Sequence, residues 1–360
     1  MREFHKAAVM FSLALIGGSA QAAIFCVANA DELQQALLDA SSNGVSDSIR
    51  IEAGVYTGSS GISAFSYATN QNFGLAIVGG YLSLSGQPCV TQTLDPSLTV
   101  LNGSGGRQVL LLQPNAATGG NITVSNLTIR GGRSAQTGAG LSINGGANFA
   151  GNVTVSRVIF GRNVSSAFAG GLSIATAGVV NVLNNLFLGN QCNANSCAMT
   201  ATVNASDPAA LRAFFGNNTI VGNTCLASAP PTCDIGGMRF GGNARAVFYN
   251  NAFAFQSGAD LALNSVTTEL YDNNIVSLSG SPAAMSGNLA FADPLFVNVL
   301  DDNLRLSFAS PLRNAGGNAY GLMSTDLDDN PRVIDVVVDI GAYENQLLDL
   351  LFADGFESIE

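Results

Sequence analysis

The amino-acid sequence predicts an all-β solenoid, in which each repeat forms one coil of short parallel strands. A phrase of apolar residues around asparagine recurs between Val124 and Val276, and its first Asn, or the Arg replacing it, is residue 126, 157, 184, 217, 250 and 273. The phrases are therefore 31, 27, 33, 33 and 23 residues apart. A second phrase precedes most of them, as in Gly170-Gly171-Leu172-Ser173-Ile174. Such periods are typical of solenoids, and apolar residues alternating with small polar ones are typical of half-buried strands.

The recurring asparagines are expected at sharp bends between strands, because a short amide tolerates positive φ and can bond its own backbone. Successive coils are about 4.8 Å apart, so stacked amides can hydrogen-bond along the solenoid. The sequence thus predicts an asparagine ladder. Its expected members are Asn126, Asn184, Asn217, Asn250 and Asn273. Arg157 interrupts the series, and we expect a wider turn there with the guanidinium outside.

Residues 1–22 have the features of a secretory signal peptide. A charged start containing His5 and Lys6 precedes an apolar run, and Ala20-Gln21-Ala22 offers a cleavage site. A membrane anchor is the alternative, but the run is short and ends in Gly-Gly-Ser. We therefore expect a secreted or cell-surface protein, with no transmembrane segment in the mature chain.

Removing residues 1–22 removes the only His and the only Lys of the sequence. The mature chain then has 12 arginines against 24 acidic residues, a net charge of −12. Of this, −10 comes from the region after residue 292, so the coils are nearly neutral. Nothing supplies a patch that neutralises phosphates, which argues against nucleic acid and anionic membranes as partners.

Six cysteines remain, and an even number in an exported chain favours disulfides. They are Cys26, Cys89, Cys192, Cys197, Cys225 and Cys233. A Cys26–Cys89 bridge would fasten the first coils. The other four flank two equivalent loops, and either each loop closes on itself or the bridges join neighbouring coils. A zinc site is a less favoured alternative, because His is lacking and the spacings are unusual.

In chain order, residues 24–47 are predicted to form a helical cap. Asn29-Ala30-Asp31-Glu32 resembles a capping box, and the following apolar residues share one helical face. The coils are expected at about 48–290, with residues 58–72 as a loop, and an acidic closing module at 291–344. Residues 23–344 thus form one domain, and residues 345–360 form a tail that either carries a sorting signal or simply packs on the last coil.

The order of these features resembles the right-handed parallel β-helix proteins of the pectin-lyase-like superfamily. The closing module is more specific, and it resembles that of bacterial proteins with a choice-of-anchor Q domain. Its motifs are Asp293-Pro294-Leu295-Phe296, Thr325-Asp326-Leu327-Asp328-Asp329-Asn330-Pro331-Arg332 and Asp339-Ile340-Gly341-Ala342-Tyr343-Glu344. The family usually has Gly at the position of Asp329. The resemblance implies a bacterial surface or secreted protein and a right-handed parallel β-helix with an N-terminal α-helical cap.

The resemblance allows two enzymatic functions, hydrolysis and lyase chemistry. Hydrolysis on this fold needs clustered carboxylates, commonly with His, and the coils offer no close Asp pair. A polysaccharide lyase needs carboxylates for Ca²⁺ and a basic residue that removes a proton. The best such cluster is Arg239, Asp234, Asp260 and Asp272, although a surface ion pair explains it equally well.

Two further groups are candidate ligand sites. Arg130, Arg133, Arg157 and Arg162 fall at the bends of two coils and can form a basic strip for an acidic glycan, or simply solubilise the turns. Asp326, Asp328 and Asn330, completed by Asp335 or Asp339, offer oxygen ligands for Ca²⁺, although a metal-free Asx turn is the simpler interpretation. The favoured function is non-enzymatic, as an adhesin-like, glycan-binding or structural surface protein whose partner is an extracellular polysaccharide or a cell-surface ligand. The alternative is a polysaccharide lyase acting on an acidic glycan.

Overall fold

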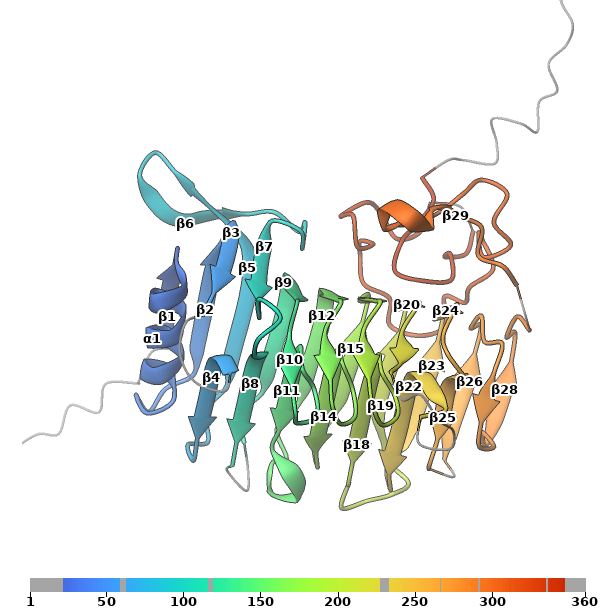
Figure 1. Cartoon of the computed structure of the whole chain (residues 1–360), viewed down its shortest axis with the longest axis horizontal. Helices are drawn as coiled ribbons and strands as arrows, with labels where there is room; N and C mark the ends of the chain where they lie inside the picture. Colours follow the sequence, from blue (N-terminus) through green and yellow to red (C-terminus); the bar gives the residue numbers. More distant parts are fainter. Residues whose placement is uncertain are drawn as a thin grey trace, which may run out of the picture.

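The computed structural model describes residues 22–58, 63–115, 119–226, 233–265, 267–290, 292–334 and 336–346. The predicted signal peptide, apart from Ala22, and residues 347–360 of the predicted tail lie outside this range. The described chain is nearly all β, with long parallel sheets and one α-helix (Figure 1).

The strands form three parallel sheets, and a short antiparallel hairpin follows them. The main sheet runs in the order β1 (Ala23–Val27), β2 (Asp47–Glu52), β5 (Leu75–Leu84), β9 (Ile122–Arg130), β12 (Val153–Gly161), β15 (Val180–Leu183), β19 (Leu211–Gly216), β23 (Arg245–Tyr249), β26 (Thr268–Tyr271) and β28 (Ala284–Ser286). Strands β3 (Gly54–Thr57), β6 (Gln87–Gln92), β7 (Thr99–Asn102), β16 (Leu186–Leu188), β20 (Thr219–Val221) and β24 (Ala252–Ala254) extend it. The β5–β6 pair within it is antiparallel.

The second sheet consists of β4 (Ser63–Thr69), β8 (Gln108–Pro114), β11 (Leu141–Asn144), β14 (Leu172–Thr176), β18 (Met199–Val203), β22 (Ile235–Gly242), β25 (Ala259–Leu263) and β27 (Leu278–Ser279). A short sheet holds β10 (Arg133–Ser134), β13 (Val164–Ser165), β17 (Gln191–Cys192) and β21 (Thr224–Cys225). From β9 to β20 the chain passes repeatedly through the main, short and second sheets, and each strand pairs in parallel with its counterpart one repeat later. This arrangement is consistent with a β-helix.

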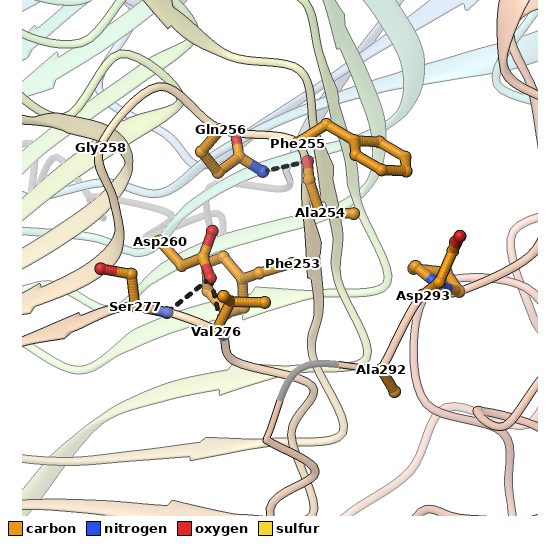
Figure 2. Close-up of a pocket in the computed structure, with 11 residues that line it drawn as sticks. Phe253, Ala254, Phe255, Gln256, Gly258, Asp260, Val276, Ser277, Ala292 and Asp293 are labelled. Carbon is orange, nitrogen blue, oxygen red and sulfur yellow. Dashed lines mark hydrogen bonds between the residues drawn. The ribbon is translucent and has the colours of Figure 1, made fainter.

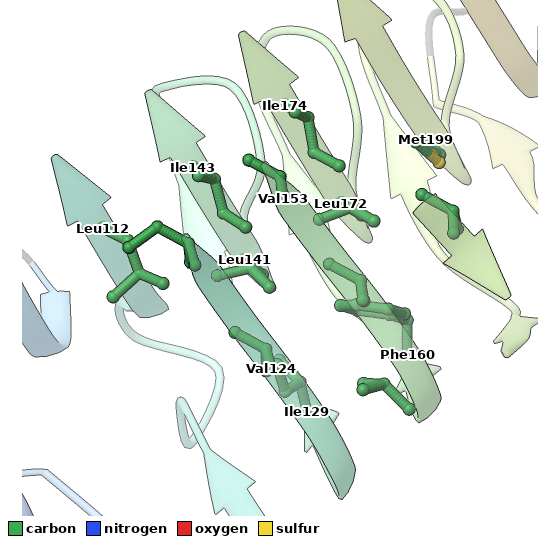
Figure 3. Close-up of a cluster of buried hydrophobic side chains, with 14 of the residues drawn as sticks. Leu112, Val124, Ile129, Leu141, Ile143, Val153, Phe160, Leu172, Ile174 and Met199 are labelled. Atoms are coloured by element: carbon green, nitrogen blue, oxygen red, sulfur yellow. The ribbon is translucent and has the colours of Figure 1, made fainter. Parts of the chain in front are cut away.

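Side chains that alternate along the strands fill the space between the sheets (Figure 3). Leu141, Ile143 and Val124 are fully or almost fully buried, and equivalent residues of successive repeats lie one above the other. Aromatic rings stack in the same way, with 4.9 Å between the ring centroids of Phe160 and Phe187. The core is therefore one continuous apolar column, because each repeat buries its inward row against the next.

The α-helix, α1 (Ala30–Ala40), packs against β1, β2 and β4 at one end of the sheets (Figure 1). Asn29 Oδ1 accepts a hydrogen bond from Glu32 N–H at 3.0 Å, and Glu32 Oε2 accepts one from Ala28 N–H at 2.8 Å. This is close to a capping box. The predicted apolar face, Leu33, Ala36, Leu37 and Ala40, is buried.

The predicted loop at 58–72 is wrong in part, because β4 lies within it and pairs with β8. Phe65 and Tyr67 point into the core, while Ser66 between them faces outward. The content of serine, glycine and asparagine in residues 58–72, on which the loop prediction rested, concealed this alternation.

Asparagine ladders are present, but the main one uses the second Asn of the phrases that begin at Asn184, Asn217 and Asn250. Asn185, Asn218, Asn251, Asn273 and Asn288 form it, and each Nδ2 donates to Oδ1 of the next at 2.8–3.0 Å. A second ladder runs through Asn163, Asn190, Asn223 and Gln256. Of the five predicted residues, only Asn273 belongs to a ladder.

The first Asn of each phrase makes the bend instead. Asn126, Asn184, Asn217 and Asn250 have φ between 52° and 58°, and Arg157 and Asp272 continue this row with φ of 55° and 54°. At a left-handed residue between two strands the side chain points away from the core, so the amide of the following residue faces inward. The last repeat is therefore aligned through Asp272 rather than Asn273.

The C-terminal segment, defined here as residues 292–334 and 336–346, lies against the side of the coils near β20 and β24 (Figure 1). It contains the antiparallel hairpin of β29 (Phe296–Asn298) and β30 (Asn303–Leu306). Leu304, Leu327 and Ala342 pack on Leu186 and Val221 of the coils. The outward residues of the bends hold this segment, because Asn250 Nδ2 donates to Gly317 O at 2.9 Å and Asn184 Nδ2 to Thr325 O at 3.3 Å.

The sequence suggested that Arg157 forms a wider turn with its guanidinium outside, and this prediction is wrong. Its coil keeps an uninterrupted register with both neighbours, and the residue is 3% exposed beneath the C-terminal segment. The guanidinium donates to the carbonyl oxygens of Leu94, Asp326 and Leu327. Arg157 thus links the coils, the loop before β7 and the C-terminal segment.

Candidate functional site

The outward face of the second sheet carries two rows of residues, most of them polar. Strand alternation points Leu141 and Ile143 into the core, so Ser142 and Asn144 lie on the opposite face of the strand, where Ser142 is 8% exposed and Asn144 is exposed. The parallel register aligns outward residues across successive strands. One row is Leu111, Ser142, Ser173, Thr200 and Arg239, and the other is Gln113, Asn144, Ala175, Thr202 and Gly241. Hydroxyl and amide groups are thereby repeated at the spacing of the coils.

These rows form the floor of a groove of about 560 Å³, called here the polar groove. Gln136, Thr137 and Phe168 also line it, and Phe168 is 37% exposed. The Arg239 guanidinium carbon lies 5.9 Å from the Phe168 ring centroid. Arg239 also donates to Asn264 Oδ1 at 2.7 Å in the amide orientation that satisfies both side chains. A flat aromatic ring, a cation and many neutral donors and acceptors therefore face one hollow.

The four residues of the lyase hypothesis do not converge. Arg239 lies in the polar groove, whereas Asp260 is buried in a different pocket. Its Oδ2 accepts hydrogen bonds from Val276 N–H at 2.8 Å and Ser277 N–H at 3.1 Å (Figure 2). Asp272 lies in the row of bends, next to Gly317. Asp234 N–H donates to Asn195 Oδ1. Among the described residues, no ion pair joins Arg239 to a carboxylate.

Asp260 instead lines a mostly apolar pocket of about 380 Å³ (Figure 2). Phe253, Ala254 and Val276 form much of its wall, and Phe255 lies at its edge with φ of 60° and 56% exposure. Burial raises the pKa of the Asp260 carboxyl, and its two backbone hydrogen bonds oppose this rise. Both bonds support the turn after Ile275, so the carboxylate acts structurally within this part of the chain.

The four arginines of the predicted basic strip are separated. Arg130 and Arg162 line a cleft of about 480 Å³ between the coils and the C-terminal segment, together with Arg305 and Tyr343. Two of its cations are paired, Arg162 with Asp302 at 2.6 Å and Arg305 with Asp328. Arg133 is exposed on β10, and Arg157 is buried as described above.

The predicted calcium ligands form hydrogen-bonded turns. Asp326 Oδ1 accepts from Asp328 N–H at 3.0 Å and Asn330 N–H at 2.8 Å, while its Oδ2 accepts from Glu344 N–H. This is the Asx turn that the sequence allowed as the simpler interpretation. Asp339 accepts from Asn314 and Asn345 N–H. Asp335 lies outside the described residues.

A buried charged cluster in the C-terminal segment was not identified from the sequence. Arg332 is 2% exposed, and its Nη2 donates to Gly341 O. Desolvation lowers the pKa of Arg332, and the nearby acidic groups Glu344, Asp326 and Asp339 oppose this shift. Burial, with the neighbouring Asp339 carboxylate, raises the pKa of Glu344 from 4.5 to about 8. Only the tertiary structure brings these groups together, so the spacing of acids in the sequence gave no signal of a raised pKa.

The raised pKa of Glu344 predicts that the protein loses stability as the pH rises. Between pH 4.5 and about 8 the folded state keeps a proton that the unfolded state has released, so the free energy of unfolding falls with increasing pH. The loss is on the order of a few kcal/mol. Urea unfolding at pH 5 and pH 8 measures it. Glu344→Gln keeps an oxygen for Asp339 N–H and should be more stable than the wild type at pH 8.

Glu269→Gln is the control, because Glu269 is a half-buried carboxylate that pairs with Arg245 at 2.5 Å on the main sheet. This variant should keep the pH slope of the wild type. A Glu344→Gln protein with an unchanged slope would show that another group titrates in this range.

All six cysteines are paired, as Cys26–Cys89, Cys192–Cys197 and Cys225–Cys233. The first pair is the predicted clamp. The other two show that each loop closes on itself, which resolves the alternatives left by the sequence. Cys192 and Cys225 are partners in register on β17 and β21, so these two disulfides lie on adjacent coils.

No helix within the described residues has the length and apolar character needed to cross a membrane. In comparisons with known proteins, no family model, curated protein or solved structure matches this chain.

Proposed function

We propose that the chain is an exported, surface-displayed right-handed parallel β-helix that binds a glycan in the polar groove without catalysis. In this proposal α1 is the N-terminal cap, and the protein is related to pectin-lyase-like proteins with a choice-of-anchor Q domain. The three disulfides are compatible with an extracellular location.

The alignment of neutral polar side chains in the polar groove carries this proposal. Because the coils repeat, Ser142, Ser173 and Thr200 present hydroxyl groups in a line along the protein. A linear polymer with repeated hydroxyls can meet the same donors and acceptors at successive coils. Phe168 offers a ring for stacking on a sugar face, and Arg239 offers a charge for an acidic substituent.

A lyase acting on an acidic glycan is the alternative function. That chemistry requires carboxylates beside the basic residue that removes the proton. The described partners of Arg239 are the Asn264 amide and the Phe168 ring. This environment suits binding better than proton abstraction.

Binding to a panel of neutral and acidic polysaccharides by affinity electrophoresis tests the proposal. We expect retardation by at least one polysaccharide, and Phe168→Ala should weaken this binding about tenfold or more through loss of ring stacking. Arg239→Gln should weaken binding to acidic members of the panel more than to neutral ones. With Ca²⁺ present, ultraviolet absorbance should detect no unsaturated uronate product.

Arg212→Gln is the matched control, because Arg212 belongs to β19 of the main sheet and does not line the polar groove. It should bind like the wild type. Equal losses in the Arg212 and Arg239 variants would indicate non-specific charge attraction, and release of unsaturated product would support the lyase.

A further inference from the structure

We propose that Cys192, Cys197, Cys225 and Cys233, when reduced, form a tetrathiolate site for one soft divalent metal ion such as Zn²⁺. The disulfides and the metal are then alternative states of the same four sulfurs. This inference is independent of the proposed glycan binding.

The four sulfurs already lie in one cluster, although they belong to two disulfides. Cys197 Sγ is 3.8 Å from Cys225 Sγ and 3.8 Å from Cys233 Sγ, and Cys192 Sγ is 3.9 Å from Cys233 Sγ. The coils enforce this proximity. Cys192 and Cys225 are in register in the short sheet, and Cys197 N–H donates to Ile235 O, two residues after Cys233.

Three of the four sulfur distances between the two disulfides match those of a tetrahedral thiolate site. Zn–S bonds of about 2.3 Å in a tetrahedron place neighbouring sulfurs about 3.8 Å apart. Three sulfur pairs of the cluster have this separation within 0.1 Å. Cys192, Cys197 and Cys233 have sulfurs that all lie within 4.8 Å of one another, and Cys225 does not join this group. The tetrahedron therefore closes when reduction lengthens the two bonded pairs and the side chains of Cys192 and Cys225 rotate toward each other.

The surroundings of the cluster suit a metal with four thiolates. Cys192 and Cys197 are fully buried, while Cys225 and Cys233 are partly exposed and give a route of entry. Ser196, next to Cys197, is fully buried and its Oγ has no hydrogen-bond partner. A hydroxyl in this position can donate to a thiolate sulfur and stabilise its charge.

The conversion of the two disulfides into four thiols balances when a dithiol is the reductant. Each of two dithiols gives two electrons and two protons to one disulfide and becomes a disulfide itself, which leaves four protein thiols. Metal binding then releases the four thiol protons. Two disulfides of a thiol oxidoreductase reverse the sequence: they take four electrons from the four thiolates and four protons from solvent, become dithiols, and the metal is freed as the two protein disulfides re-form.

Cobalt titration of the reduced protein tests the proposal. The full chain is reduced with a dithiol, desalted without oxygen, checked by circular dichroism and titrated with Co²⁺. We expect one Co²⁺ per chain with thiolate-to-cobalt charge transfer and tetrahedral ligand-field bands, which Zn²⁺ abolishes. Cys197→Ser removes one ligand and should weaken Co²⁺ binding more than about 100-fold, beyond the loss typical of an outer-shell change.

The double variant Cys26→Ser/Cys89→Ser is the matched control, because it removes the remaining disulfide and should bind Co²⁺ like the wild type. If the reduced chain unfolds, recovery of the native spectrum on adding Zn²⁺ also supports the site. A folded reduced protein without the cobalt bands, or unfolding that Zn²⁺ does not reverse, would overturn the proposal.

Discussion

Replacing Asn218 by Ala is expected to lower the free energy of unfolding by about 3 kcal/mol or more, because several buried polar groups lose their partners. Asn218 Oδ1 accepts from both the backbone and the side-chain amide of Asn185 at 3.0 Å. Its Nδ2 donates to Val182 O at 2.9 Å and to Asn251 Oδ1 at 2.8 Å. The substitution interrupts the ladder at its second rung. Chemical denaturation followed by circular dichroism measures the loss.

Asn217 is the matched control, because it is the same residue type at the adjacent position and is buried almost as deeply. Its Nδ2 has no hydrogen-bond partner, and its φ is 52°. Asn217→Gly accepts this backbone conformation, so its stability should stay within about 1 kcal/mol of the wild type. If Asn217→Gly destabilised the protein more than Asn218→Ala, the second Asn would not carry the ladder.

Replacing Arg157 by Ala is expected to detach the C-terminal segment from the coils. The change leaves the carbonyl oxygens of Leu94, Asp326 and Leu327 without their charged donor and opens a cavity beneath Thr325. Hydrogen bonds to charged groups each contribute about 1.5–3 kcal/mol, so we expect a loss of several kcal/mol, concentrated in this segment. Hydrogen exchange with peptide resolution should show faster exchange in residues 292–346 than in β14 or β18.

Arg133→Ala serves for comparison, since Arg133 is an exposed arginine one coil earlier. The Arg133→Ala variant should leave hydrogen exchange unchanged both in residues 292–346 and in β14 and β18. Uniformly faster exchange across all coils in the Arg157 variant would mean that Arg157 stabilises its own coil rather than the docking of the segment.

Much of the β architecture could be predicted from the repeats. Alternation around Leu172 and Ile174 indicated inward rows, and recurrence at similar intervals indicated parallel stacking. The helix at Ala30–Ala40 was also predictable, since Asn29 and Glu32 mark its start. Which of the two asparagines in a phrase makes the bend and which joins the ladder could not be predicted, because both tolerate a bend and both can stack. Only the left-handed φ at Asn217 shows that Asn218 faces inward.

The candidate sites were predicted less well than the fold. Arg239 was singled out from the sequence, but its neighbours in space are Phe168 and Asn264, which come from other coils. Arg130 and Arg162 do share a cleft, yet Asp302 reaches Arg162 from a part of the chain 140 residues away. Charges at such separations cannot be paired from spacing in one sequence.

The sequence by itself determined that the strands are parallel and that amides stack in ladders, because both follow from the period of the repeat and from local chemistry. It also offered Cys26–Cys89 as a candidate disulfide. The tertiary structure alone decided which asparagine faces the core, that Arg157 is buried, and that four cysteines of two coils form one cluster. The physical reason is that each of these depends on how a coil sits on its neighbour and on where the C-terminal segment packs. Both are set by contacts between residues far apart in the chain.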